Sequence, residues 1–387
     1  MHGGEYARSP FDPEIPMTAF ADTYRDASVL LTGHTGFKGS WLAQWLLHCG
    51  AKLTGYALDP QPHETLYDSL GISARLVGDH RGNLSELDHL SAIVAELKPK
   101  FVFHLAAQPL VRLSYDIPVE TFTTNVMGTV HLLEAVRRSG HDCTVVVITT
   151  DKCYENREWL HSYREEDAMG GHDPYSASKG AAEIAAASYR RSFFDPGGKV
   201  AMATARAGNV IGGGDWALDR IIPDCIRALR AGETIPVRNK IATRPWQHVL
   251  EPLSGYLWLG AALHHSSVVG YPDNKPFRSS FNFGPRLTSN RTVAGLVEEL
   301  IRHTGGQWQD CSDPSAPHEA SKLNLAIDKA FHLLQWQPVW DFPETISRTA
   351  EWYLADQDGE SASHLCDRQI EAYQTAAAAA GLSWARL

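Results

Sequence analysis

Five side chains that can transfer protons or donate hydrogen bonds lie in two short stretches of the sequence. A run of apolar residues typical of a β-strand is followed by Thr150, Asp151 and Lys152. Tyr175 and Lys179 follow in a helix-forming segment, at a spacing that puts them on one helix face. Ligands of open α/β sheets bind outside the carboxyl ends of the strands. We therefore predict that these five residues form an active site.

The pair formed by Tyr175 and Lys179 is suited to accepting a proton. A free tyrosine has a pKa of about 10 and is a weak base at neutral pH. An ammonium group held close favours the phenolate and lowers that pKa. We expect Tyr175 to take the proton of a sugar or alcohol hydroxyl while a hydride passes to NAD. This spacing also occurs by chance with an exposed helix lysine, but Thr150 and a glycine-rich turn favour catalysis.

That glycine-rich turn follows a strand predicted over residues 29–32 and precedes a helical pattern of large apolar residues. Glycines let the backbone approach a pyrophosphate, and the helix N-terminus faces its charge. The P-loop motif does not fit, because Lys38 precedes the last glycine instead of following it. The turn is therefore predicted to bind a dinucleotide through Gly33, Thr35, Gly36, Phe37, Lys38 and Gly39.

The acid expected to bind the ribose is Asp59. It follows a strand predicted over residues 53–58 and lies 20 positions after Gly39 (59 minus 39). An acidic residue at about this distance commonly binds the ribose hydroxyls of NAD, and its charge repels the 2′-phosphate of NADP. A turn aspartate beside Pro60 is a nearly equal interpretation.

Residues at two further strand ends complete the predicted cofactor site. One strand, expected near residues 75–78, ends in an acid, and another, from residue 101, runs into small residues. Small side chains let a flat cofactor lie against the backbone, although two alanines also suit simple packing. The residues concerned are Asp79, Ala106, Ala107 and Gln108.

Strands and helices alternate along the first half of the chain. Helices are predicted over residues 86–97, 121–139 and 174–194, and strands over 144–149 and 199–205. This alternation predicts an α/β fold with a Rossmann-type, doubly wound parallel sheet. After Gly208 the alternation is less regular, which indicates a smaller C-terminal substrate-binding region. We expect a polar leader (1–28), an NAD-binding domain carrying the catalytic residues (29–207), a mainly substrate-binding region interleaved with the sheet (208–360) and a peripheral tail (361–387).

The composition argues against several classes of function. The formal net charge of −10 gives no electrostatic footprint for nucleic acid. No apolar run approaches the roughly 18 residues of a membrane span, and the first 28 residues lack the apolar core of a signal peptide. The six cysteines are scattered without C-x-x-C spacing, which favours reduced thiols and no zinc site. We expect a cytoplasmic protein without a bound metal.

Five longer segments resemble the extended short-chain dehydrogenase/reductase family and, within it, the nucleotide-sugar 4,6-dehydratases. The resemblance covers roughly residues 28–355. It implies NAD as cofactor, CDP-glucose as substrate and a redox-neutral loss of water. It also implies a homodimer in which helices 121–139 and 174–194 pair into a four-helix core. The segments that carry it are residues 32–41, 106–115, 150–154, 206–216 and 244–253.

The resemblance also implies a role for each catalytic residue. Tyr175 removes the proton of the C4 hydroxyl while NAD takes the C4 hydride, and Thr150 hydrogen-bonds the C4 oxygen. Asp151 protonates the leaving C6 hydroxyl, and the hydride returns to C6. Most 4,6-dehydratases carry a glutamate as the C5 base where this chain has Lys152, as the CDP-glucose subgroup does. Lys152 is therefore either a base with a lowered pKa or a cation that stabilises the enolate while water or Tyr175 takes the proton.

Substrate-binding residues are implied in the same way. Asn209, Arg220 and Arg244 match positions that hold the nucleotide diphosphate, and arginine forks suit that group. Arg220 also suits a plain helix-face charge. His318, with Glu319, matches the position that meets the nucleotide base, although an exposed loop pair would look the same.

Several points about cofactor binding and function stay open. Relatives that bind NAD tightly often carry the acid directly at the strand end, where this chain has Ala57, so NAD binding is expected to be weaker here. A nucleotide-sugar 4-epimerase or dehydrogenase would use the same fold without needing Asp151 as an acid. A 4,6-dehydratase that acts on another nucleotide sugar fits the same motifs, and a non-catalytic NAD sensor would have no need of Tyr175 and Lys179.

Overall fold

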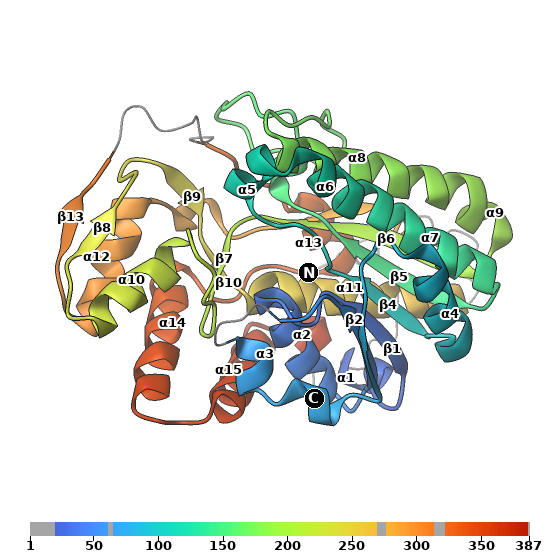
Figure 1. Ribbon diagram of the computed structural model, residues 1–387, viewed down its shortest axis with the longest axis horizontal. Helices are drawn as coiled ribbons and strands as arrows, with labels where there is room; N and C mark the ends of the chain where they lie inside the picture. The colour runs from blue at the N-terminus through green and yellow to red at the C-terminus, as the bar shows by residue number, and fades with distance from the viewer. Residues whose placement is uncertain (1–19, 61–64, 269–275, 313–321, 386–387) are drawn as a thin grey trace, which may run out of the picture.

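A parallel sheet of seven strands forms the centre of the molecule (Figure 1). The computed structural model describes residues 20–60, 65–268, 276–312 and 322–385. The strand order is β11-β6-β5-β4-β1-β2-β3, with parallel neighbours throughout, so the predicted Rossmann-type fold is confirmed. The strands are β1 (Ser28–Thr32), β2 (Lys52–Ala57), β3 (Gly78–Arg81), β4 (Phe101–His104), β5 (Cys143–Ile148), β6 (Val200–Ala207) and β11 (Ser280–Phe283).

Helices cover both faces of the sheet, and each face has its own apolar core. Successive residues of a strand point to opposite faces, so Val146 and Ile148 join one core while Val145 and Val147 join the other. This double burial explains the unbroken apolar run of β5. One face packs against α2 (Phe37–His48), α11 (Leu250–Val268) and α15 (Ala362–Ala379), and the other against α4 (Leu87–Leu97), α7 (Gly128–Ser139) and α8 (Pro174–Tyr189).

The two long helices expected beside the site are present, each with an irregular turn. α6 (Pro118–Phe122) continues through a π-helical turn, Thr123–Met127, into α7. α8 continues through a second π-helical turn, Arg190–Phe194, into α9 (Asp195–Gly197). Such turns widen the helix locally and shift the side chains that follow. Helical spacing alone does not reveal them.

The strand expected near residues 75–78 lies further along the chain. Ile72–Arg75 form a 3-10 turn, and β3 runs over Gly78–Arg81, so Asp79 lies within the strand. β3 is the outer neighbour of β2. Edge strands carry polar and charged residues, which is why an apolar pattern did not locate it.

We expected residues 1–28 to form a polar leader, and this expectation is wrong for residues 20–28. Residues 1–19 lie outside the described ranges, but α1 (Phe20–Tyr24) packs into the core, where Phe20 stacks on Trp384 with ring centroids 5.3 Å apart. The Tyr24 hydroxyl donates a hydrogen bond of 2.6 Å to the carbonyl of Leu257. Residues 20–28 therefore belong to the folded domain.

The C-terminal segment was expected to be peripheral, and this expectation is also wrong. α15 packs on α2, where the amide of Gln44 donates to the Asp367 carboxylate at 2.6 Å. Tyr373 and Trp384 are buried and stack with ring centroids 5.8 Å apart. The buried aromatic residues, rather than the alanine-rich stretch, determine where this segment lies.

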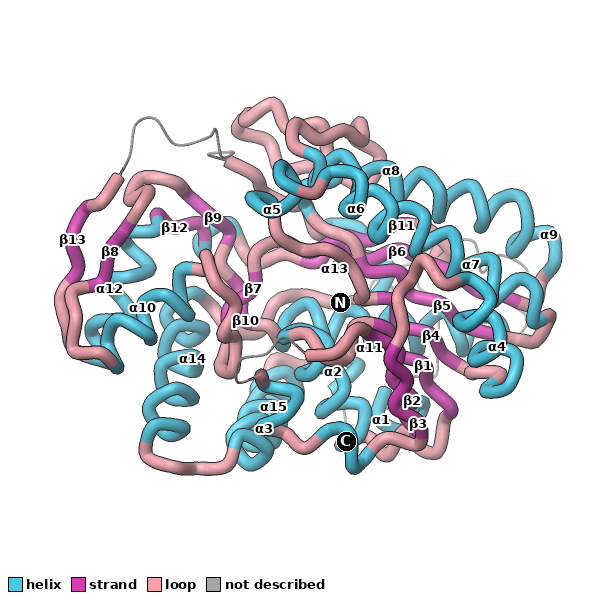
Figure 2. The backbone as a smooth tube through the Cα atoms, in the orientation of Figure 1, coloured by secondary structure: helices cyan, strands magenta, loops and turns pink. Residues whose placement is uncertain are grey.

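The region after residue 208 adds a second, smaller layer of helices beside the carboxyl edge of the sheet (Figure 2). The chain then returns to the main sheet as β11. No helix in the described ranges is long and apolar enough to cross a bilayer. The remaining elements are α3 (Leu66–Ser69), α5 (Val111–Asp116), β7 (Val210–Ile211), α10 (Ile221–Arg230), β8 (Ile235–Val237), β9 (Thr243–Pro245), β10 (Gln247–His248), β12 (Asn290–Thr292), α12 (Val293–Thr304), β13 (Trp308–Asp310), α13 (Asp328–Leu334) and α14 (Phe342–Gln357).

Candidate active site

The glycine-rich turn between β1 and α2 is packed so closely that two of its glycines are required. Gly33 has φ +77, and a Cβ there would lie 2.7 Å from the backbone nitrogen of Ala106. A Cβ on Gly39 would lie 2.0 Å from the carbonyl oxygen of Gly33. Gly36, the N-cap of α2, has ordinary room, with a nearest contact of 3.5 Å. The turn leads into α2, whose first residue is Phe37. The turn and the N-terminus of α2 form a cradle that fits a dinucleotide pyrophosphate.

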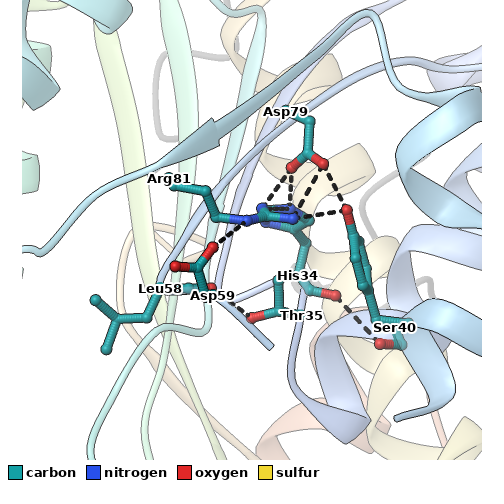
Figure 3. A network of polar contacts seen from close by, with 8 residues as sticks. His34, Thr35, Ser40, Leu58, Asp59, Asp79 and Arg81 are labelled. Carbon is teal, nitrogen blue, oxygen red and sulfur yellow. Dashed lines mark hydrogen bonds and ion pairs between the residues drawn. The ribbon is translucent and has the colours of Figure 1, made fainter. Parts of the chain in front are cut away.

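Asp59 and Asp79 lie beside this cradle in different environments. The hydroxyl of Thr35 donates to the carbonyl of Leu58 at 3.2 Å, which holds the turn against the loop after β2. Asp59 follows in that loop and its side chain is 85% exposed (Figure 3). Asp79 lies deeper and accepts a hydrogen bond of 2.6 Å from Arg81. Asp59 is therefore exposed at the rim, where it pairs with Arg81 at 3.2 Å and could meet a ribose, while Asp79 is held inside a polar network.

That network controls the charge of Asp79. Asp79 accepts from the Tyr67 hydroxyl at 2.5 Å, and His34 Nε2 lies 2.8 Å from its other oxygen. Burial alone would raise the pKa of Asp79, but hydrogen bonds from Tyr67 and His34 and the charge of Arg81 lower it. The carboxylate is therefore ionised and already satisfied by protein groups.

The loop after β4 closes the cradle from the other side. The backbone nitrogen of Ala106 donates to the hydroxyl of Thr32 at 3.2 Å, and Ala107 follows. The side-chain amide of Gln108 donates to Thr121 at 2.9 Å and to the Leu110 carbonyl at 3.1 Å. Gln108, predicted as a cofactor contact, thus has its side-chain amide engaged within the protein.

The structure brings Thr150, Asp151, Tyr175 and Lys179 together at the end of β5. All four are buried. Thr150 caps the 3-10 turn Asp151–Cys153, and its hydroxyl donates to Asp151 at 3.0 Å. The side chain of Asp173 caps α8 by accepting from the backbone of the third helical residue at 2.9 Å. This cap fixes the first turn of α8, which carries Tyr175, opposite the end of β5.

The predicted lowering of the Tyr175 pKa is wrong in this structure. Burial raises the pKa of Tyr175 to about 12, because a buried phenol favours its neutral form. A hydrogen bond with Thr150 and the charge of Arg220 act in the opposite direction, while the Asp151 charge raises the pKa further. Burial also lowers the pKa of Lys179 to about 8, against the charge of Glu183.

The pKa of Asp151 is shifted in the direction that suits a catalytic acid. Burial raises the pKa of its carboxyl, although Lys152, Thr150 and Arg244 act in the opposite direction. A raised pKa favours the protonated carboxylic acid, the form that can give a proton to a leaving hydroxyl. Lys152 is half-buried next to it.

Two of the predicted substrate residues lie close enough to the catalytic side chains to act on them electrostatically. Arg220, the N-cap of α10, pairs with Asp215 at 2.9 Å and lies near enough to Tyr175 to lower its pKa. Arg244 of β9 is buried and its charge acts on Asp151. Asn209 follows β6 and is half-buried. His318 and Glu319 lie outside the described residues.

Lys38 was predicted to contact the cofactor through the turn, but its side chain reaches the catalytic side. It lies in the first turn of α2, with Nζ 3.5 Å from the hydroxyl of Tyr256 on α11. Burial lowers the pKa of Lys38 to about 8; the charges of Arg220 and Lys179 lower it further, whereas Asp151 raises it. Lys38 is therefore a second amine close to the predicted catalytic residues.

Sequence reasoning missed a buried ion pair behind the catalytic helix. Glu183 of α8 and Arg206 of β6 lie 2.9 Å apart, and both side chains are almost fully buried. Glu183 also accepts hydrogen bonds from Thr149 at 2.5 Å and Thr204 at 2.8 Å. An arginine inside a mostly apolar strand, and a glutamate one turn after Lys179, were the signals available, because buried charges need partners.

The part of the chain that the structure describes contains no group of three or more histidine, cysteine or acidic residues arranged to hold a metal. The polar groups of the site are instead hydroxyls, carboxyls and cations placed around a cradle for a dinucleotide. This donor set suits proton and hydride transfer on an organic substrate.

Comparisons with known proteins identify the family of the chain. The family model described as GDP-mannose 4,6 dehydratase matches residues 30–349. CDP-glucose 4,6-dehydratase of Salmonella typhimurium is 46% identical over 353 residues, which cover 90% of this chain and 96% of that protein. dTDP-glucose 4,6-dehydratase of Streptomyces antibioticus is 29% identical, covering 84% of this chain and 92% of that protein.

Solved structures share the fold at lower identity. dTDP-glucose 4,6-dehydratase from Bacillus anthracis, in complex with NAD, has a TM-score of 0.69 at 22% identity and covers 85% of this chain and 97% of that one. UDP-glucose 4-epimerase from Thermotoga maritima, with UDP-glucose, has a TM-score of 0.71 at 20% identity and covers 85% and 99%. The fold is therefore common to dehydratases and epimerases, whereas the family model and the relatives narrow the assignment: the chain belongs to the GDP-mannose 4,6-dehydratase family of nucleotide-sugar dehydratases.

Proposed function

We propose that the protein is an NAD-dependent hydro-lyase that converts CDP-D-glucose to CDP-4-dehydro-6-deoxy-D-glucose. The relative with 46% identity over nearly its whole length is a CDP-glucose 4,6-dehydratase. The buried carboxyl of Asp151, beside Thr150 and near Tyr175, supports this reaction most directly. A dehydration needs an acid at the leaving hydroxyl, whereas a 4-epimerase or a simple dehydrogenase does not.

The first half of the reaction uses the residues at the start of α8. Bound NAD supplies the acceptor for the C4 hydride and later the donor for C6, so no cofactor is consumed. Tyr175 takes the proton of the C4 hydroxyl, and Thr150 hydrogen-bonds the C4 oxygen. Burial opposes the phenolate, and the Thr150 hydroxyl and the positive charge of Arg220 act to stabilise it. We assign the ammonium of Lys179 the same role.

The second half removes water. The C4 ketone acidifies the C5–H bond, so that an enolate can form and expel the C6 hydroxyl. Asp151 gives its proton to that hydroxyl, which leaves as water, and the proton lost from C5 replaces the one that Asp151 gave. The C5=C6 double bond then takes up the hydride at C6 and a proton at C5, which balance the hydride and the hydroxyl proton removed at C4. Lys152 fits two roles at C5, as the base or as the cation that stabilises the enolate.

Exchange of the C5 proton separates the two roles of Lys152. In Lys152→Met, the wash-in of solvent deuterium at C5 stops if the lysine is the base. It slows but persists if water or Tyr175 takes the proton. Mass spectrometry of the recovered sugar nucleotide measures the exchange.

The diphosphate is proposed to lie against Asn209, Arg220 and Arg244. Incubation with NAD and a panel of CDP-, dTDP-, GDP- and UDP-glucose tests the substrate. We expect the ultraviolet absorbance of a 4-keto sugar in base with CDP-glucose and far less with the others. A C4 epimer without any 4-keto product would favour the epimerase, and turnover of another panel member would reassign the nucleotide.

We also propose that two copies pair through α6–α8. Exposed apolar side chains lie along these helices, including Val119 at 79% and Ile184 at 61% exposure. Burying such a surface is favourable. Sizing at micromolar concentration should give twice the chain mass of 42.7 kDa, and Ile184→Asp should give the single-chain mass. A wild-type protein at the single-chain mass contradicts the pairing.

The cytoplasm is the proposed compartment. All six cysteines are free thiols, and five of them are buried. A reducing compartment keeps such thiols from pairing.

A further inference from the structure

The loop between β7 and α10 (Figure 1) carries a buried acid to which the reaction above gives no role. The side chain of this acid, Asp215, is 5% exposed. Its Oδ2 lies 2.9 Å from Nη1 of Arg220, the residue that caps α10. A buried carboxylate is costly unless it is paired, so the contact between these two side chains is a defined part of the structure.

Asp215 is held through its side chain and through its backbone. Oδ1 accepts a hydrogen bond of 3.2 Å from the backbone nitrogen of Ala217, and Oδ2 accepts from Arg220. The backbone carbonyl of Asp215 accepts a hydrogen bond of 2.7 Å from the hydroxyl of Tyr353 on α14. Tyr353 is buried, and its hydroxyl also lies 3.3 Å from the carbonyl oxygen of Gly212. The carboxylate therefore has a fixed position.

The core of the protein leaves the loop before Asp215 little room to shift. A Cβ on Gly213 would lie 1.9 Å from the ring of Trp352 on α14. The carbonyl of Gly213 accepts a hydrogen bond of 3.0 Å from the indole nitrogen of Trp41 on α2. The loop is thus clamped between α14 and the helix that begins at the cofactor cradle.

The guanidinium of Arg220 is less firmly supported. Its side chain is 35% exposed, and within the described ranges Nη1 is the one atom of the guanidinium that makes a hydrogen bond, the bond to Asp215. An arginine has five N–H donors in a fork that suits phosphate, so most of them stay available to a ligand. The charge of Arg220 already acts on Tyr175, whose pKa it lowers. Asp215 therefore holds a cation that lies beside the catalytic side chains.

We propose that Asp215 is a positioning residue that orients Arg220 toward the diphosphate of the sugar nucleotide, and that Tyr353 holds Asp215 in place for this task. The inference rests on the diphosphate contact of the proposed function. It requires a negative charge to improve the binding of an anion, because the orientation given to the arginine outweighs the added repulsion. A plain counter-ion would act in the opposite way, since its removal would leave the site more positive and the anion better bound.

Calorimetric titration with CDP in the presence of NAD measures this effect without turnover. We expect Asp215→Asn to weaken CDP binding about tenfold, the value of one hydrogen bond to a charged group. Asparagine keeps the size of the side chain and can still accept from Ala217, so the change removes the charge. Arg220→Gln should weaken CDP binding too. Adding Asp215→Asn to it should cause little further loss, because Asp215 acts through that arginine.

Tyr353→Phe tests the outer link of the same chain of contacts. It keeps the ring and removes the hydroxyl, so CDP binding should weaken about threefold. Tyr24→Phe is the matched control, because Tyr24 is also buried and donates a hydrogen bond of 2.6 Å to a backbone carbonyl, that of Leu257. Both variants should melt at lower temperature, and only Tyr353→Phe should weaken CDP binding.

Three results would overturn the proposal. One is an Asp215→Asn protein that binds CDP as well as the wild type or better, as a plain counter-ion predicts. Another is a loss that is equally large in the Arg220→Gln background, which means that Asp215 acts elsewhere. The third is a wild type that binds neither CDP nor UDP. If Asp215→Asn does not fold, Tyr353→Phe takes its place in the cycle with Arg220→Gln.

Failure of the proposed function gives different results. Binding of UDP in place of CDP, with the same pattern among the variants, would contradict only the nucleobase of the proposed substrate. Titrations as expected without turnover of CDP-glucose would contradict the dehydratase alone.

Discussion

Burial has opposite consequences for the two central side chains of the site. It raises the pKa of Asp151, which favours the protonated carboxyl that can act as an acid. It also raises the pKa of Tyr175, which makes the phenol a poorer proton acceptor. The spacing of Tyr175 and Lys179 correctly places two groups in one site, but it carries no information about how deeply they are buried. Burial is the largest cause of the shift in the Tyr175 pKa, and the groups that oppose it are Thr150 and Arg220 rather than the expected lysine.

Substitution of the two residues should interrupt the reaction at different points. Tyr175→Phe should abolish C4 oxidation, so that no NADH absorbance appears in a single turnover. Asp151→Asn should slow elimination by about 10²–10⁴-fold while NADH still accumulates, because hydride transfer precedes the step that needs the acid. Stopped-flow absorbance separates them. Unchanged turnover in both variants contradicts the assigned roles.

The ammonium of Lys179 gives the reaction a pH limit. Its pKa is lowered to about 8 by burial, so it is charged below that pH and loses its proton as pH rises through it. Because the charge supports the Tyr175 anion, kcat/KM should fall above a pH of about 8. Lys179→Met should lower kcat/KM and remove that descending limb. If the descending limb of kcat/KM persists unchanged in Lys179→Met, the limb belongs to another group.

At the scale of elements, the ion pair between Glu183 and Arg206 locks α8 to the sheet. Glu183 projects from α8 to Thr149 after β5 and to Thr204 and Arg206 on β6. The same helix carries Lys179 one turn earlier, and the charge of Glu183 raises the pKa of that lysine. The pair thus positions the catalytic helix and keeps its amine charged.

Glu183→Gln should affect both stability and pH dependence. It leaves Arg206 buried without its partner, which costs about 3–5 kcal/mol. It also removes a charge that raises the Lys179 pKa, so the descending limb of kcat/KM should move to lower pH. Glu183→Asp should restore part of each effect. Loss of stability without any movement of the limb would make the pair purely structural.

Alanine substitution at a closely packed glycine of the turn, such as Gly39, should lower the melting temperature more than the same substitution at Gly36. Gly39→Ala forces a Cβ to 2.0 Å from a backbone carbonyl, so the apoprotein should melt at lower temperature. Gly36→Ala has a nearest contact of 3.5 Å and should leave the melting temperature nearly unchanged while weakening NADH binding. Equal melting temperatures for the two variants would contradict the packing described for the turn.

The sheet and the cradle could be predicted because their local signals are strong, whereas other elements carry none. β5 is apolar throughout since both of its faces are buried, and Gly33 and Gly39 stand where backbones touch. β3 lacks an apolar pattern because it is an edge strand, and the aromatic contact of Phe20 with Trp384 joins residues at opposite ends of the chain. The partner of a buried charge such as Arg206 lies on another element of the fold, so its identity cannot be read from the local sequence.

At the scale of the whole molecule, the first and last described segments, residues 20–24 and 383–385, are part of the core under α2. Trp384→Ala removes a side chain that is 1% exposed and should cost about 3–5 kcal/mol. Trp159, which is 36% exposed, provides a matched control, and Trp159→Ala should cost much less. Denaturant unfolding measures both. Equal losses would mean that the C-terminal segment is not part of the core.

The transfer of one hydrogen within the hexose tests the proposed reaction most directly. CDP-glucose labelled with deuterium at C4 is converted in unlabelled water, and the product is analysed by mass spectrometry and NMR. We predict that the deuterium moves to the C6 methyl group and that C5 carries a solvent proton. Deuterium that remains at C4, or a product that keeps its C6 hydroxyl, would contradict the dehydration.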